Sequence, residues 1–76
     1  MSFVEQFQLV ERLHTLIKKK GTGSPKELAI RLNISRASVF RQISILKNLG
    51  AKISYCKRRG SYIYDEKFSI FFQESQ

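Results

Sequence analysis

The sequence predicts a single domain over residues 1–76 that is mainly α-helical and carries one small β-hairpin. Two observations predict this class. Apolar residues recur at helical spacing through the first two thirds of the chain, and after Gly50 they alternate as in strands. The hydrophobic content of 42% is that of a globular domain, and a chain this short buries about 60% of its unfolded surface.

The first predicted element is an amphipathic helix over residues 2–20. A stripe of leucine and isoleucine should pack on the other helices. A second apolar stripe beside it consists of Phe3, Phe7, Val10 and His14. Two stripes exceed what a three-helix core needs, which indicates either a larger core or a subunit interface. Because the chain has one histidine and one cysteine, we interpret His14 as a packing residue and expect no metal site.

Two shorter helices joined by a tight turn follow. The first is expected over residues 25–32, where Ser24 and Glu27 form a capping box and a proline occupies the first helical position. Asn33 tolerates the left-handed backbone conformation of the turn. The second helix is expected over residues 36–49, and a glycine ends it. This pair predicts a helix-turn-helix.

A β-hairpin is expected over residues 52–64. Ile53 and Tyr55 share one face of the first strand, and the turn between the strands contains Lys57, Arg58 and Arg59. Like charges at an exposed turn repel one another unless an anion lies nearby, so this turn is a candidate binding site. The alternative is a strand edge protected from aggregation by its charge.

The chain ends with a tail or short helix expected over residues 66–74. Its aromatic residues lie at helical spacing, and they are Phe68, Phe71 and Phe72. A segment this short is unstable alone and should dock on an apolar surface, such as the one around Phe3 and Phe7. Docking within one chain would give a monomer, and docking between chains would give a homodimer.

The charge of the chain is unevenly placed. The formal net charge is +8, the pI is about 10.1, and no acidic residue lies between Glu27 and Asp65. That interval contains eight cationic residues, which are Arg31, Arg36, Arg41, Lys47, Lys52, Lys57, Arg58 and Arg59. A solubilising surface usually mixes both signs, so this pattern favours a polyanion as the partner.

The candidate DNA-binding residues lie at the start and on the outer side of the second helix of the pair and in the hairpin turn. They are Ser35, Arg36, Ala37, Ser38, Arg41, Lys57, Arg58 and Arg59. Arginine pairs with guanine or clamps phosphate, alanine contacts a thymine methyl group, and serine binds phosphate. The three cations of the turn would reach the flanking minor groove or the backbone. Thr22 is a weaker phosphate candidate.

Several other classes are disfavoured. The sequence shows no carboxylate pair in a plausible pocket, no nucleophile with a base and no glycine loop for phosphate, so we expect no enzyme and no cofactor. Cys56 is alone, which excludes an internal disulfide, and we interpret it as a strand residue without a redox role. We expect a cytoplasmic protein with no membrane span and no secretory signal.

At ISRASVFRQISILKNLGAKISY and RRGSYIY the chain resembles the DNA-binding heads of WYL-type and biotin-ligase-type bacterial transcriptional regulators. The resemblance covers roughly residues 9–64. It implies a winged helix-turn-helix that binds duplex DNA sequence-specifically in transcriptional control. The chain departs from the pattern at Asn33, where glycine is common, and at Ile45, where those heads carry a charge. Within these 76 residues we also expect no downstream effector domain, and therefore no ligand control within this stretch.

These features are consistent with two functions. The first is a DNA-binding module, which we expect to work as a homodimer because two half-sites supply the specificity that one small binder lacks. The second is a winged-helix module that docks on proteins without specific DNA binding. The aromatic surplus at both termini would supply that contact.

Overall fold

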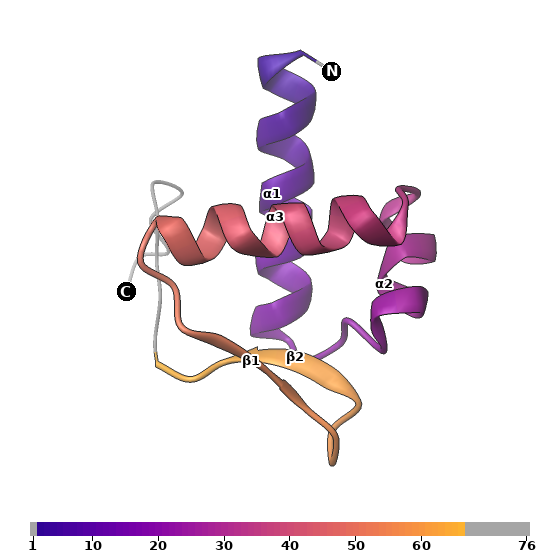
Figure 1. Ribbon diagram of the computed structural model, residues 1–76, viewed down its shortest axis with the longest axis vertical. Helices are drawn as coiled ribbons and strands as arrows, with labels where there is room; N and C mark the ends of the chain where they lie inside the picture. The colour runs from indigo at the N-terminus through magenta and orange to yellow at the C-terminus, as the bar shows by residue number, and fades with distance from the viewer. Residues whose placement is uncertain (1, 67–76) are drawn as a thin grey trace.

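The computed structural model describes residues 2–66, which form three helices and one antiparallel hairpin. The elements in chain order are α1 (Phe3–Lys18), α2 (Pro25–Leu32), α3 (Arg36–Asn48), β1 (Ile53–Cys56) and β2 (Ser61–Tyr64). Figure 1 shows α3 lying across α1, with α2 beside them and the hairpin below α3 at the C-terminal end of α1. The expected class, mainly α with a small hairpin, is confirmed.

Serine side chains begin all three helices. Ser2 and Ser24 form capping boxes, in which each hydroxyl accepts from the backbone N–H of a glutamate three residues later and that glutamate accepts from the serine N–H. Ser35 caps α3 by accepting from the N–H of Ser38 at 3.1 Å. These local caps place each helix start within a residue of the position that the sequence indicated.

Left-handed residues end the helices. Asn33 has φ 59° and ψ 46°, as expected for the turn between α2 and α3. Lys20 has φ 58°, which stops α1 at Lys18, two residues before the end of the expected range 2–20. Gly50 has φ 109° and follows the C-cap residue Leu49, so α3 ends one residue before the expected range 36–49 does.

The hydrophobic core draws on every element. Its members are Leu9, Val10, Leu13, Ile17, Leu28, Ala29, Leu32, Val39, Ile43, Leu46, Ala51, Ile53 and Tyr62. Leu9, Leu13 and Ile17 of α1 lie inside this cluster, and Leu16 is half-buried and packs against it. Leu49, the C-cap residue of α3, is 48% exposed.

One part of the second apolar stripe of α1 is buried, and the other part is exposed to solvent. Val10 and His14 are buried, and the His14 ring lies 5.4 Å from the ring of Tyr64 on β2, with Nδ1 2.7 Å from the tyrosine hydroxyl. Phe7 is half-buried and stacks on Phe3, whereas Phe3 is 82% exposed. Val10 and His14 are therefore buried inside the domain and cannot form the subunit interface that we considered. The exposed part of the stripe is confined to the start of α1.

The hairpin pairs Ile53 with Tyr64 and Cys56 with Ser61. Gly60 at the turn has φ 62°, the positive value that the turn requires. The predicted tail over residues 66–74, with Phe68, Phe71 and Phe72, lies outside the described residues from residue 67 onward. Within residues 2–66, no helix has the length and apolar character to cross a membrane.

Candidate nucleic-acid interface

The inner face of α3 is fixed against α1. Val39, Ile43 and Leu46 are at most 5% exposed, and they recur at helical spacing. Gln42 lies between them and is 3% exposed. Its Oε1 accepts a hydrogen bond of 2.6 Å from Nε2 of Gln6 on α1, so this buried amide has a partner. The inner face therefore determines which side of α3 meets solvent.

The outer face of α3 carries the expected site residues. Arg36, Ala37 and Arg41 are exposed on the first two turns. Ser35 is exposed, and its hydroxyl donates to Oγ of the half-buried Ser38 at 3.0 Å. The N–H groups of the first helical turn lie at this same end, where the helix dipole favours an anion.

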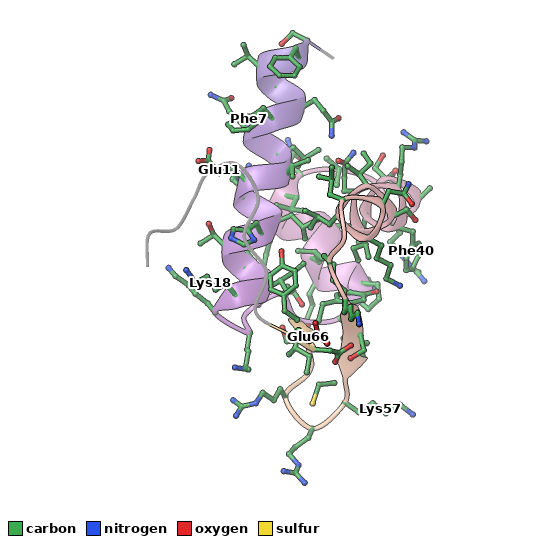
Figure 2. The ribbon with its side chains drawn as sticks, turned by 90° about the vertical axis from the view of Figure 1, so that its left-hand side faces the viewer. Phe7, Glu11, Lys18, Phe40, Lys57 and Glu66 are labelled. Atoms are coloured by element: carbon green, nitrogen blue, oxygen red, sulfur yellow. The ribbon has the colours of Figure 1, made fainter. Side chains whose placement is uncertain are left out.

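Sequence reasoning missed an aromatic residue on this face. Phe40 is 48% exposed and lies one turn after Ala37. Figure 2 shows Phe40 on the side of α3 that points away from α1. The sequence pattern could have predicted this exposure, because on a helical wheel Phe40 lies outside the stripe formed by Val39, Ile43 and Leu46.

The hairpin turn presents the second group of cations. Lys57, Arg58 and Arg59 are all exposed. Figure 2 shows Lys57 and Phe40 on the same side of α1, whereas Lys18 lies on the opposite side. The structure thus places Arg36, Ala37 and Arg41 on the exposed part of the first two turns of α3, and Lys57 of the hairpin turn lies on the same side of α1 as Phe40.

Two cations of the acid-free interval are already engaged within the molecule. Arg31 donates to the Gly21 carbonyl at 2.6 Å, and Lys52 forms a 3.4 Å salt bridge with Glu66. The cations of the outer face of α3 and of the turn remain exposed. Those exposed cations make the positively charged surface.

Thr22 does not lie on that surface. It is fully buried, so it cannot reach a phosphate as we had considered. Its N–H donates to Oγ of Ser61 at 3.1 Å, and its Oγ1 lies 3.0 Å from the same oxygen. Its Oγ1 also accepts from the Tyr62 N–H at 2.8 Å. Thr22 therefore joins the loop after α1 to β2 and holds the hairpin on the helices.

The acidic residue that borders the basic interval has a structural role. The pKa of Glu27 is lowered, first by the hydrogen bond from the backbone of Ser24 and also by the charge of Arg31. Its carboxylate accepts that bond at 2.8 Å. Glu27 is thus part of the α2 cap. Among residues 2–66, no three histidine, cysteine or acidic side chains gather as a metal site would require.

The comparisons with known proteins agree with this geometry. A family model described as "HTH domain" matches residues 6–62, which is more than half of the chain. A search of curated proteins and a search of solved structures gave no match. The matched residues include most of α1, all of α2 and α3, and most of the hairpin. The expected winged helix-turn-helix resemblance is thereby confirmed, and the chain belongs to the HTH domain family of DNA-binding domains.

Proposed function

We propose that this chain is a sequence-specific duplex-DNA-binding module of a bacterial, cytoplasmic transcriptional regulator. One observation carries the proposal. The exposed start of α3 bears Arg36 and Arg41, and Lys57 of the cationic hairpin turn lies on the same side of α1 as Phe40 of α3. The net charge of +8 and the membership of a DNA-binding family support the same partner.

The proposed contacts follow from the two groups of cations. The N-terminal end of α3 enters the major groove, where Arg36 and Arg41 pair with guanine or clamp phosphates. Ser35 and Ser38 bind a phosphate beside the helix start, and Ala37 contacts a base edge. Lys57, Arg58 and Arg59 contact the flanking minor groove or backbone. No step of this mechanism requires catalysis, a metal or a cofactor.

Selection of bound sequences from a random duplex pool at physiological salt tests this function. We expect a defined motif, and with about six phosphate contacts the affinity for it should fall steeply as salt rises. A pool that stays random after selection would contradict sequence-specific binding. It would favour the docking function described below.

We further propose that the module acts as a homodimer on two half-sites. The exposed Phe3, stacked on Phe7 at the start of α1, supplies an apolar surface for this contact. The sequence adds Phe68, Phe71 and Phe72 as candidates, which lie outside the described residues. Size-exclusion chromatography with light scattering should give twice the monomer mass. A monomer at high micromolar concentration would remove this proposal.

The second candidate is a winged-helix module that docks on another protein. The observation that favours it is the exposure of Phe3 and Val4, 82% and 60%, on the part of α1 that extends beyond α3 (Figure 1). A docking module of this kind should not be retained on duplex DNA at physiological salt. Retention of the chain there, with a selected motif, would remove this candidate.

A further inference from the structure

The basic face of α3 has an apolar centre. Ala37 and Phe40 are three residues apart and share one side of the helix, with Arg36 and Arg41 next to them in the chain. Ala37 is exposed and Phe40 is 48% exposed. Figure 2 shows that Phe40 points away from the core. The two side chains thus form an apolar spot within a surface that is otherwise polar and cationic.

The position of this spot distinguishes it from an ordinary exposed apolar residue. Single exposed apolar residues are normal, and Leu49 at the other end of α3 is also 48% exposed. Phe40 differs because it lies beside the two arginines that would reach base edges. Any double-stranded DNA that meets Arg36 and Arg41 must therefore also meet the phenyl ring.

Duplex DNA offers few apolar groups to such a ring. In the major groove the base edges present hydrogen-bond donors and acceptors, and the C5-methyl group of thymine is the apolar exception. We propose that Phe40, with Ala37 one turn before it, binds the methyl groups of thymines next to the base pairs that Arg36 and Arg41 contact. This inference rests on the proposed function and adds thymine preference to it.

Replacing thymine by deoxyuridine in the selected duplex tests this directly. Deoxyuridine lacks only the methyl group and keeps every hydrogen-bonding group, so a change in affinity reports the apolar contact alone. We expect the unmodified chain to bind about 4-fold more weakly for each contacted methyl that is removed, from the burial free energy of one such group. The loss should occur at one or two positions of the site and not at the other thymines.

The variant Phe40→Ala connects that loss to the residue. It should weaken binding to the thymine duplex, and it should discriminate less between the thymine and deoxyuridine duplexes at the sensitive position, because only Ala37 is left to contact the methyl group. Phe40→Leu keeps an apolar side chain and should retain part of the discrimination. Leu49→Ala is the matched control, because it removes an equally exposed apolar side chain at the other end of α3 and should leave the discrimination unchanged.

The outcomes separate this inference from the proposed function. A chain that selects no sequence fails as a sequence-specific binder. A chain that selects a motif but binds thymine and deoxyuridine equally at every position keeps the proposed function and loses the thymine contact. Discrimination that is undiminished in Phe40→Ala would also overturn the inference, because Phe40 would then not contact the methyl group.

Discussion

The helix α3 and the hairpin both attach to the same body, but by different kinds of contact. Apolar side chains make most of the contact of α3, with Val39, Ile43 and Leu46 buried in the core. A hydrogen bond between the side-chain amides of Gln42 and Gln6 adds to them. The hairpin adds Ile53 and Tyr62 to that core, and it also depends on buried polar bonds between Thr22 and the start of β2. In Figure 1, α3 crosses the middle of α1, whereas the hairpin lies at the C-terminal end of α1.

The difference teaches how small elements are oriented. A helix of 13 residues has enough turns to present a full apolar stripe. A strand of four residues has two inward side chains, which can bury the hairpin but leave its tilt poorly determined. Hydrogen bonds depend on direction, so the bonds at Thr22 can set the tilt that apolar contacts leave open. The cationic turn is positioned by this polar joint.

The largest effect should come from the apolar anchor. Leu46→Ala removes a fully buried side chain from α3 and should lower the free energy of unfolding by about 2–5 kcal/mol. Leu49→Ala on the exposed helix end is the control and should change it by less than ~0.5 kcal/mol. Urea denaturation followed by circular dichroism measures both. Equal losses would mean that the inner face of α3 is not the anchor.

The polar joint should give the next effect. Thr22→Val keeps the shape of the side chain but removes the oxygen that accepts from the buried Tyr62 N–H and lies beside Ser61 Oγ, so we expect a loss of about 1–3 kcal/mol in unfolding free energy. The backbone N–H of residue 22 can still donate to Ser61 Oγ. Thr15→Val is the matched control, since the Thr15 hydroxyl bonds only the Glu11 carbonyl of its own helix at 3.1 Å and is exposed. If both variants lose the same stability, the joint has no special role.

A smaller effect should appear in DNA binding by the hairpin turn. Lys57→Ala removes one proposed phosphate contact, so the slope of log affinity against log salt should become shallower by about 1. Lys18→Ala removes the same charge on the opposite side of the molecule (Figure 2) and should leave the slope closer to its original value. Identical slopes in the two variants would show that net charge alone, and not the turn, controls binding.

The smallest effect concerns pH. The folded-state pKa of Glu27 lies below the ordinary 4.5, so its ionised form stabilises the fold above that pH, and the contribution is lost as pH falls through the lowered value. Glu27→Gln should reduce this acid dependence, because glutamine does not titrate. Melting temperatures from neutral pH down to acid measure it. A variant with unchanged acid dependence would assign that dependence to other carboxylates.

Sequence reasoning recovered the parts of the fold that depend on neighbours in the chain. The capping box at Ser24, the left-handed turn at Asn33 and the buried stripe of α3 each involve residues within one or two helical turns. Such patterns are visible as spacing. The outward face of α3 follows directly from the stripe, which is why the exposure of Arg36 and Arg41 could be predicted.

The missed features join residues that are far apart in the chain. Gln42 is buried because Gln6 lies opposite it, and Thr22 is buried because Ser61 meets it. A glutamine or threonine gives no local sign of a distant partner, so the burial of both was missed and Thr22 was considered as a phosphate ligand instead. His14 was interpreted as a packing residue, but no local pattern indicated its partner Tyr64 on β2.

The central claim is that the start of α3 recognises DNA. Arg41→Ala tests it most directly when its affinity for the selected duplex is measured at two salt concentrations, with Lys18→Ala as the control. We predict a loss of about 1–3 kcal/mol in specific binding for Arg41→Ala at both concentrations, and a much smaller change in the preference of Lys18→Ala for that duplex. Unchanged affinity of Arg41→Ala for the selected site would contradict the assignment of this face.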